Sequence, residues 1–330
     1  MKHINVALFV PHAGCSHRCI FCDQRAISGQ TRPLTAADIV DACETAAKCP
    51  HDRENSEIAF FGGSFTAVDP ALMRMCLDTA APFLQRDFGG IRISTRPDAV
   101  DENTLLLLKQ KGVTAIELGA QSMDDGVLAQ NERGHTAADT VRAAELIKTF
   151  GFSLGLQMMT GLYGSSPQKD RQTALSLCAL QPDTMRIYPT VVLEGTRLCE
   201  LYRAGDYTPP SLEDSVSLCA ALLQLVENAG VRVIRLGLHA GAEGTLHFVA
   251  GPYHPAFREL CEGEIYRFAI GEQLRKLPKG QVLVTVAPGD VSKAAGHGRR
   301  NTSFFKEQGY LIKIKEQAGV PRYIPAAASV

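Results

Sequence analysis

Short apolar runs alternate with longer amphipathic segments up to about residue 239, and this alternation constrains the fold more than any other feature of the chain. The runs have the length and composition of buried β-strands, and the segments between them are long enough for helices. Strands separated by helices build right-handed βαβ units on a parallel sheet. The expected strands are Ile4–Val10, Glu57–Phe61, Ile91–Thr95, Ala115–Gly119, Ser153–Met158, Thr184–Tyr188 and Val231–Leu236.

The number of these units indicates a barrel. Six or seven βαβ units suit a full or partial (β/α) barrel better than a short open sheet, so we predict an α/β fold with a partial TIM-like (β/α)6–7 barrel. Helix starts support this interpretation: Thr35 with Asp38 resembles a capping box, and Ser211 follows a proline at another helix start. Ligands of such folds bind at the carboxyl ends of the strands, so the loops after the strands are the expected place for chemistry.

The pattern changes after about residue 239. A stretch rich in Gly, His and Ala precedes a helical segment at about 255–274 and strand-like runs at 281–286 and 310–314. We therefore predict a barrel domain over residues 1–239 and a small C-terminal α+β appendage over residues 240–330.

The appendage contains a basic segment. Between Arg267 and Arg322 the chain carries eleven Lys and Arg residues against four Asp and Glu residues, although its formal net charge is −1. One interpretation is that this segment contacts RNA phosphates, with Phe304, Phe305 and Tyr310 available to stack bases. The alternative is a solvated basic face that packs its aromatic residues inward. The candidate phosphate contacts are Lys293, Arg299, Arg300 and Lys306.

Composition excludes several classes of protein. Apolar residues make up 45% of the 330 residues and charged residues 21%, which excludes disordered and fibrous chains. No apolar run approaches about 18 residues, and the first residues lead straight into an expected strand. We therefore predict a cytoplasmic protein with no membrane span and no signal peptide. Ten cysteines in such a chain indicate metal chemistry rather than disulfides.

The most specific chemical signal is a group of three cysteines in the loop after the first expected strand. Cys15, Cys19 and Cys22 have the spacing Cys-x-x-x-Cys-x-x-Cys. Three thiolates on one short loop can hold three irons of a 4Fe–4S cluster and leave the fourth iron open to a small chelating molecule. A zinc site with His12 or His17 as fourth ligand is the alternative, although zinc loops usually bring their ligands in two separated pairs. The other seven cysteines are expected to be small core residues.

The cysteine spacing, with Phe21 just before the last cysteine, resembles the signature of the radical S-adenosylmethionine (SAM) enzymes. The resemblance implies a 4Fe–4S cluster whose open iron is chelated by the amino and carboxylate groups of SAM. It also implies that an electron, supplied by a donor such as flavodoxin or ferredoxin, cleaves SAM to a 5′-deoxyadenosyl radical in an oxygen-sensitive reaction.

Residues after the later strands extend the resemblance. Gly62, Gly63 and Ser64 end the second expected strand, where the radical SAM pattern places a Gly-Gly-Glu-like turn that accepts the SAM ammonium; Ser64 departs from that glutamate. The following segments are similar in order to the catalytic subunit of Elongator, which modifies tRNA wobble uridine, and to oxygen-independent coproporphyrinogen oxidase. Arg133 is implied as a bidentate donor to the SAM carboxylate. The SAM contacts implied by matching positions are Ser94, Gln121, Arg133 and Gln157.

Some of these matches are incomplete. Ser94 and Gln157 stand where the porphyrin enzymes carry acids, and each polar residue taken alone is also compatible with a solvated loop. Tyr188 and His239 lie in Elongator-like segments and are candidate substrate contacts at the barrel mouth, with a buried structural role as the alternative. The resemblance covers about residues 1–239, and the remaining residues are too few for the acetyltransferase domain of Elongator.

Three functions follow from these observations. The first is a radical SAM enzyme that acts on RNA, with tRNA as a partner, and it is favoured by the Elongator-like order of motifs and the basic segment. The second is a radical SAM enzyme that acts on a small molecule such as a tetrapyrrole. The third is a non-catalytic iron–sulfur or zinc module, which would bind metal without cleaving SAM.

Overall fold

The computed structural model describes residues 3–10, 13–15, 19–23, 32–84, 86–238 and 247–330. Its main feature is a seven-stranded sheet in which every neighbouring pair of strands is parallel, in the order β1-β2-β3-β4-β5-β6-β8. The strands are β1 (Asn5–Phe9), β2 (Glu57–Phe61), β3 (Gly90–Thr95), β4 (Val113–Gln121), β5 (Ser153–Thr160), β6 (Thr184–Pro189) and β8 (Arg232–Leu236).

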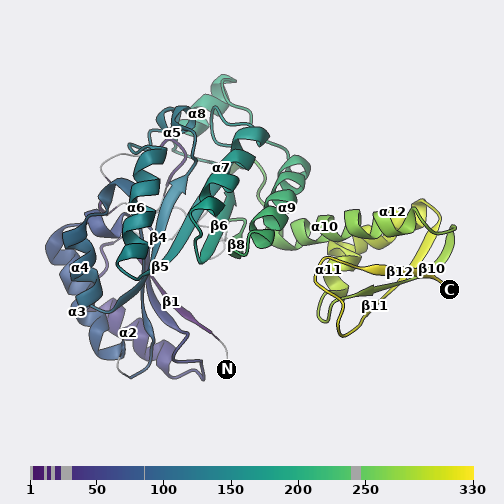
Figure 1. Cartoon of the computed structure of the whole chain (residues 1–330). Coiled ribbons are helices and arrows are strands. Elements are labelled where there is room, and N and C mark those ends of the chain that lie inside the picture. Colours follow the sequence, from purple (N-terminus) through teal and green to yellow (C-terminus); the bar gives the residue numbers. More distant parts are fainter. Residues whose placement is uncertain (1–2, 11–12, 16–18, 24–31, 85, 239–246) are drawn as a thin grey trace.

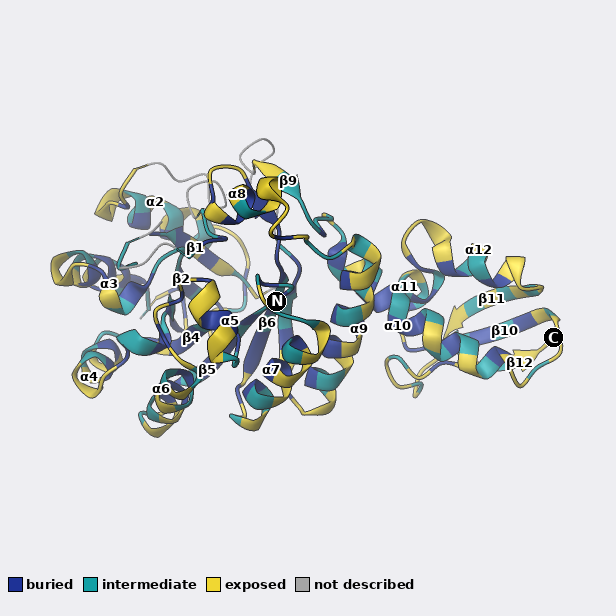
Figure 2. Cartoon of the chain, turned by 90° about the horizontal axis from the view of Figure 1, so that it is seen from above, coloured by how far each residue is buried: buried dark blue, intermediate teal, exposed yellow. Residues whose placement is uncertain are grey.

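Helices follow the strands and cover the outer face of this sheet, which curves into a half-barrel (Figures 1 and 2). The outer helices are α2 (Ala36–Ala47), α3 (Pro70–Leu84), α4 (Glu102–Gln110), α6 (Ala137–Thr149), α7 (Pro167–Ala179) and α9 (Leu212–Asn228). The short helices α5 (Asp125–Gln130) and α8 (Arg197–Ala204) lie at the end where the strands terminate. The partial TIM-like barrel predicted from the alternation of strands and helices is therefore confirmed.

Local signals set the helix starts as the sequence predicts. Thr35 and Asp38 form a reciprocal capping box at the start of α2, and the Ser211 hydroxyl accepts a hydrogen bond from the backbone N–H of Asp214 at the start of α9. These caps satisfy backbone N–H groups that the first helical turn leaves without partners.

The main core lies between the outer face of the sheet and the helices. Alternate strand residues point to opposite faces, so one set packs against the helices while the other set lines the inside of the half-barrel. Ile58 and Phe60 of β2 and Ile91 and Ile93 of β3 belong to the first set and are fully buried. The inner set contains polar and charged side chains, among them Arg92, Glu117 and Arg186.

The C-terminal residues form a second, smaller layer structure. A three-stranded sheet in the order β11-β10-β12 packs one face against helices, and its core contains Tyr266, Val284 and Phe305. The elements are α10 (Phe257–Leu274), β10 (Gly280–Val286), α11 (Val291–Ala295), α12 (Arg300–Glu307), β11 (Tyr310–Glu316) and β12 (Ala326–Ser329). The α+β character predicted for this part of the chain agrees with these elements.

Two short strands and one terminal strand were not expected from the sequence. β7 (Val192–Leu193) pairs with β9 (Phe248–Ala250) in antiparallel orientation, although the second segment lies in a stretch interpreted as loop. The alanine-rich residues of β12 pair with the edge of β10.

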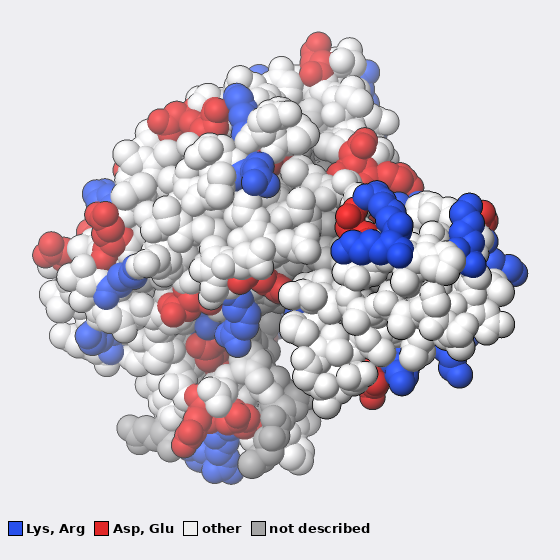
Figure 3. Space-filling model, turned by 45° about the vertical axis from the view of Figure 1, so that its right-hand side comes forward, with Lys and Arg blue, Asp and Glu red and all other residues white. Residues whose placement is uncertain are grey.

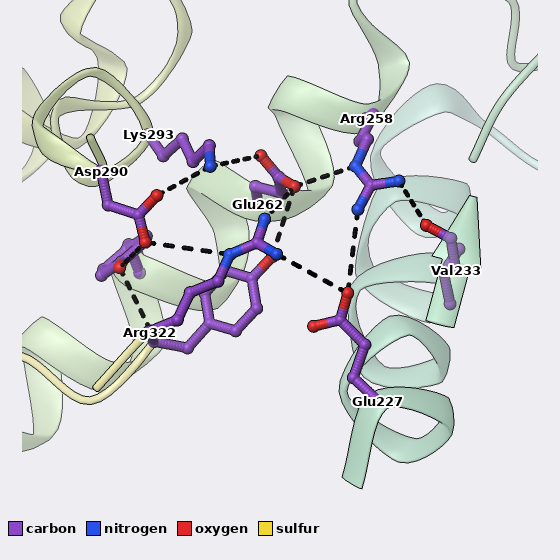
Figure 4. A network of polar contacts seen from close by, with 9 residues as sticks. Glu227, Val233, Arg258, Glu262, Asp290, Lys293 and Arg322 are labelled. Carbon is purple, nitrogen blue, oxygen red and sulfur yellow. Dashed lines mark hydrogen bonds and ion pairs between the residues drawn. The ribbon is translucent and has the colours of Figure 1, made fainter. Parts of the chain in front are cut away.

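A network of charged side chains, of which Glu262 and Asp290 are buried, links the C-terminal part to the half-barrel (Figure 4). Its centre is Glu262 of α10, which accepts hydrogen bonds from Arg258 at 2.9 Å and from Arg322 at 2.6 Å. Arg258 also donates to the Val233 carbonyl of β8 at 2.8 Å, and Arg322 lies 3.8 Å from Glu227 of α9. Three acids balance three bases in the network, namely Glu227, Glu262, Asp290, Arg258, Lys293 and Arg322.

No helix in the described part of the chain is both long and apolar enough to cross a membrane.

Candidate active site

Two glycines let the first cysteine lie against the turn after β2. A Cβ atom on Gly14 would lie 2.3 Å from the Ser64 carbonyl oxygen, and one on Gly63 would lie 2.4 Å from the Ala13 carbonyl oxygen. Only glycine permits backbones to approach this closely. The Ser64 N–H donates to the Ala13 carbonyl at 2.9 Å, and the Ser64 hydroxyl lies 3.7 Å from the Cys15 sulfur. The glycine turn predicted to accept the SAM ammonium therefore contacts the cysteine loop directly.

The second half of the cysteine loop is anchored by its apolar residues. Ile20 and Phe21 are buried in a separate apolar cluster at the barrel mouth, beside Val127, Leu162 and Leu198. Backbone hydrogen bonds fix the same segment, because the Ile20 N–H donates to the Asn131 carbonyl and the Leu198 N–H donates to the Ile20 carbonyl at 2.8 Å. Cys19 and Cys22 flank this anchor and stay half-buried.

Arg133 reaches the cysteine loop from the segment after α5. One terminal nitrogen of its guanidinium lies 2.9 Å from the Cys19 sulfur, and the other donates to the Gly119 carbonyl at 2.7 Å. The side chain is buried, and its Nε–H has no partner among the described residues. A buried donor without a partner is costly, so this nitrogen fits an anionic ligand that is not part of the chain.

Gln121 and Gln157 meet next to this arginine. The Gln157 amide donates to the Gln121 side-chain oxygen at 3.3 Å, across the pair formed by β4 and β5. Gln121 has a φ angle of 64°, which few residues other than glycine adopt, and it lies where the register of these two strands shifts. A Cβ atom on Gly119 would lie 3.0 Å from the Gln121 amide nitrogen and 3.4 Å from Arg133. Gln121, Gln157 and Arg133 therefore form one polar group beside Cys19.

The remaining candidates are less closely associated. Ser94 lies on β3, paired in register with Glu117, and Tyr188 lies on β6, paired in register with Met159; both are half-buried. The described contacts do not bring either residue to the cysteine loop. His239 lies outside the described residues, as do His12 and His17, the two candidate zinc ligands.

The three thiols offer the right donor chemistry, but they are not assembled around one point in this structure. In the described part of the chain, no group of three His, Cys, Asp or Glu side chains is arranged to hold a metal ion. The donor set nevertheless fits a 4Fe–4S cluster, because three half-buried thiols on one loop leave an open iron. The partnerless Nε–H of Arg133 beside Cys19 fits the carboxylate of a chelating ligand.

A charged network on the inner face of the half-barrel was not predicted. Glu117 of β4 is 4% exposed and forms ion pairs with Arg186 at 2.6 Å and with Arg92 at 3.4 Å. Arg92 in turn pairs with Glu57 at 2.7 Å. The guanidinium of Arg186 also lies 5.2 Å from the centre of the Phe61 ring. The signal in the sequence was the presence of single charges inside otherwise apolar strands.

His135 lies two residues after Arg133 and is also buried. One ring nitrogen lies 3.2 Å from the Ala120 carbonyl, and the other has no partner among the described residues. Burial, reinforced by the nearby Arg133 charge, lowers the pKa of His135 to about 4. The ring is therefore neutral at pH 7.

The cysteines outside the loop divide into three groups. Cys43, Cys76, Cys199, Cys219 and Cys261 are buried, as expected of small core residues. Burial raises the pKa of Cys76 to about 11 and that of Cys219 to about 12, so these thiols are protonated and unreactive. Cys178 is half-buried, whereas Cys49 is exposed, which corrects the expectation that it is a core residue.

The aromatic residues of the basic segment do not form a stacking surface. Phe305 is buried in the C-terminal core, and Phe304 packs against it at a centroid distance of 5.2 Å. The Tyr310 hydroxyl donates to the Leu274 carbonyl at 3.0 Å. Of the two alternatives, the second describes Phe305, which burial of apolar surface draws into the core, while Phe304 and Tyr310 are half-buried and pack against that core.

Family models match both parts of the chain. The model of the radical SAM superfamily matches residues 9–177, and the model of the radical SAM C-terminal domain matches residues 182–267. The chain belongs to the radical SAM superfamily. It is therefore an enzyme of that family, whose members generally bind a 4Fe–4S cluster and SAM.

Known relatives of this radical SAM protein include a tRNA uridine(34) acetyltransferase and Elongator complex protein 3. It is 29% identical over 258 residues to a tRNA uridine(34) acetyltransferase of Dehalococcoides mccartyi, which covers 67% of the chain and 56% of the relative. It is 35% identical over 140 residues to human Elongator complex protein 3, which covers 42% of the chain and 26% of the relative. The chain thus spans about half the length, or less, of these curated relatives.

Solved structures share the fold. The archaeal Elp3 of Methanocaldococcus infernus superposes with a TM-score of 0.65 at 23% identity, over 83% of this chain and 64% of the other. Coproporphyrinogen III oxidase of Escherichia coli superposes with a TM-score of 0.51 at 16% identity, over 69% of this chain and 53% of the other.

Proposed function

We propose that this radical SAM protein binds a 4Fe–4S cluster through Cys15, Cys19 and Cys22, cleaves SAM reductively, and acts on RNA, with tRNA as the substrate class. The observation that supports the site most strongly is the contact of Arg133 with the Cys19 sulfur together with the partnerless Nε–H of the same side chain. When bound, the cluster would supply the electron that splits SAM into methionine and a 5′-deoxyadenosyl radical.

The residues around the cysteine loop have separate tasks in this proposal. Arg133 neutralises the negative charge of the thiolates and donates to the SAM carboxylate. Gly62, Gly63 and Ser64 offer backbone carbonyls to the SAM ammonium, as the close approach of this turn to the loop allows. Gln121 and Gln157 supply amide groups beside the same ligand, and Phe21 keeps the loop closed on its apolar side.

The inner face of the half-barrel would hold the substrate. The paired charges of Glu57, Arg92, Glu117 and Arg186 close its floor and leave no unbalanced buried charge. Tyr188 lies on an inner position of β6, where a substrate at the mouth would meet it, and Ser94, the SAM contact implied by the resemblance, lies on an inner position of β3. A dry interior protects a reactive radical from side reactions.

The choice of RNA rests on the relatives rather than on a surface of this chain. A tRNA uridine(34) acetyltransferase and Elongator complex protein 3 are both similar to the chain, over 67% and 42% of its length. A tetrapyrrole substrate is the second candidate, and it is favoured by the likeness in fold to coproporphyrinogen III oxidase. A reduced flavodoxin or ferredoxin is the expected electron donor in either case.

The first test is formation of 5′-deoxyadenosine by anaerobically reconstituted protein with SAM and dithionite. We expect Cys19→Ala to abolish the product because the cluster loses a ligand, whereas Cys178→Ala, a half-buried thiol on α7, leaves it intact. Equal activity of the two variants would contradict the ligand assignment. A protein that binds metal without forming 5′-deoxyadenosine would be a non-catalytic module.

The second test concerns the substrate. Mass spectrometry of tRNA nucleosides from a deletion strain and from wild type should reveal a modified base that is absent without the gene. Unchanged tRNA from both strains, together with altered porphyrin content, would favour the tetrapyrrole alternative.

A further inference from the structure

A groove runs along the outer edge of the C-terminal sheet, far from the cysteine loop in the sequence. It lies between strand β11 and the helices α11 and α12, has a volume of about 710 Å³, and continues toward Lys306. Figure 2 shows α12 beside β11, on the side of the sheet opposite β12. The residues that line its main part are Gly289, Val291, Ser292, Ala295, Arg299, Thr302, Ile312, Lys313 and Ile314. We call it the β11 groove.

The strand that forms one wall of the β11 groove has an unpaired edge. β11 pairs with β10 on one side only, from Tyr310 to Glu316. No backbone hydrogen bond between described residues uses the other side of the strand. An unpaired strand edge presents a row of N–H and C=O groups that an extended peptide can join.

The floor of the β11 groove is apolar. Ile312 and Ile314 point toward the helices and remain half-buried rather than buried, and Val291 and Ala295 of α11 face them across the groove. Covering partly exposed apolar side chains in a concave site with a ligand removes apolar surface from water, and this favours binding.

The rim of the β11 groove is basic. Arg299, Lys306 and Lys313 are exposed, and none forms an ion pair with another side chain in the described ranges. Lys and Arg side chains stand out at several places on this C-terminal lobe (Figure 3). Arg299 also has a φ angle of 62°, where glycine would fit at a lower conformational cost. The chain therefore has a cation at the groove in a backbone conformation that favours glycine.

We propose that the β11 groove binds an extended acidic segment of a partner protein by strand addition to β11. Alternate apolar side chains of the segment would pack on Ile312 and Ile314. The acidic side chains between them would point to the other face of the sheet and meet Lys313 and Lys315, which are exposed there. Charge excludes a second copy of β11 as the occupant, because lysines would then oppose lysines. None of these residues belongs to the proposed active site, so this interaction goes beyond the enzyme's proposed reaction.

A nucleic acid strand fits the β11 groove less well. Single-stranded RNA is usually held by aromatic side chains that stack on its bases, and Phe305 and Tyr310 are engaged in the core. The open main-chain edge and the apolar floor match a peptide instead.

The test uses the full chain and a synthetic peptide of alternating valine and glutamate, at up to about millimolar concentration. Binding is followed by fluorescence anisotropy, and backbone amide hydrogen exchange is measured over residues 310–316. We expect the peptide to slow exchange in β11 by about tenfold, because its main chain takes up the open edge.

Matched variants separate the groove from general charge attraction. Lys313→Glu should weaken peptide binding by about tenfold, whereas Lys276→Glu, the same charge reversal at an exposed position outside the groove, should change it by less than about twofold. A valine–lysine peptide should not protect β11. The proposal would be overturned if the acidic peptide gave no protection or if the basic peptide bound equally well. It would also be overturned if an RNA oligonucleotide bound, and only its binding, not that of the peptide, were weakened by Lys313→Glu.

Discussion

At the scale of single residues, Arg133 connects most of the features of the candidate site. Its guanidinium bonds to the Cys19 sulfur and to the Gly119 carbonyl, and its Nε–H is buried without a partner in the part of the chain that the structure describes. A fixed positive charge here favours both thiolates and an anionic ligand. The neighbouring His135 is neutral, so it adds no competing charge.

Replacement of Arg133 should therefore affect ligand binding more than folding. Because hydrogen bonds to charged groups contribute about 1.5–3 kcal/mol, we expect Arg133→Gln to weaken SAM binding by about tenfold or more. Equilibrium dialysis of reconstituted protein with labelled SAM measures this change. Arg197→Gln serves as the control, since Arg197 is exposed and pairs with Glu132 in the same segment. Equal losses in both variants would contradict the assignment.

His135 should make stability depend on pH. Burial, and then Arg133, lower the folded-state pKa of this base from 6.5 to about 4. The neutral ring stabilises the fold fully above the unfolded-state pKa of about 6.5, and this contribution disappears as the pH falls toward about 4. We expect the free energy of unfolding to drop by about 3 kcal/mol over that range. Urea unfolding of wild type and His135→Gln at several pH values tests this expectation. The same dependence of the unfolding free energy on pH in both proteins would contradict it.

At the scale of elements, the site depends on how closely the loop after β1 lies against the turn after β2. Gly14 and Gly63 occupy positions where any Cβ atom would collide with backbone carbonyl oxygens. The backbone of one loop thus fixes the backbone of the other, and Cys15 is held beside Ser64 as a result.

Substitution of Gly63 by alanine should disrupt this contact. The new Cβ would lie 2.4 Å from one carbonyl oxygen and 2.5 Å from another, so β1 and β2 must separate at their ends. We expect Gly63→Ala to destabilise the fold by about 2 kcal/mol or more and to impair loading of iron. The control is Gly271→Ala within α10, which should stabilise the fold by up to about 1 kcal/mol because the nearest atom outside its own helix is 3.9 Å from the new Cβ. Thermal unfolding distinguishes the two, and a neutral Gly63→Ala would refute the explanation.

The sequence predicted elements wherever local signals agree with tertiary packing. The strands of the half-barrel are short apolar runs, and the capping residues Thr35 and Ser211 mark helix starts without help from the rest of the fold. The strand β12 could not be predicted in this way. Its alanines have low strand propensity and pair only because β10 offers an open edge.

The site was predicted less completely than the fold. Spacing alone singled out Cys15, Cys19 and Cys22, whereas the contact of Arg133 with Cys19 joins residues that are 114 positions apart. The ion pairs of Glu117 were missed for the same reason, since a charge within a strand does not reveal which strand supplies its partner. The basic neighbours of Phe305 left open whether its ring lies at the surface or in the core, and the structure buries it in the core.

At the scale of the whole molecule, the charged network around Glu262 joins the C-terminal sheet to the half-barrel (Figure 4). Glu262 is 4% exposed and receives bonds from Arg258, Arg322 and Tyr323. A network that pairs buried carboxylates with partly exposed cations fixes a particular arrangement of elements more than it adds stability. The β11 groove lies on the part of the molecule held by this network.

Removal of the negative charge of Glu262 should weaken the contact between the C-terminal sheet and the half-barrel. Glu262→Gln keeps the size of the side chain but leaves Arg258 and Arg322 without their nearest carboxylate, so we expect a loss of about 2 kcal/mol in the free energy of unfolding. Glu272→Gln on the same helix is the control, because its pair with Arg275 is exposed and should contribute less than about 1 kcal/mol. Chemical denaturation measures both values. Similar small losses of unfolding free energy in both variants would show that the Glu262 network does not hold the C-terminal sheet to the half-barrel.

The central claim is that three thiols at the mouth of the half-barrel hold an iron–sulfur cluster with one open iron. The most direct measurement is the iron, sulfide and zinc content of the protein after anaerobic reconstitution. We expect about four irons and four sulfides per chain in wild type and in Cys178→Ala, and loss of both in Cys19→Ala. One tightly bound zinc without iron, or the same iron content in all three proteins, would contradict the account.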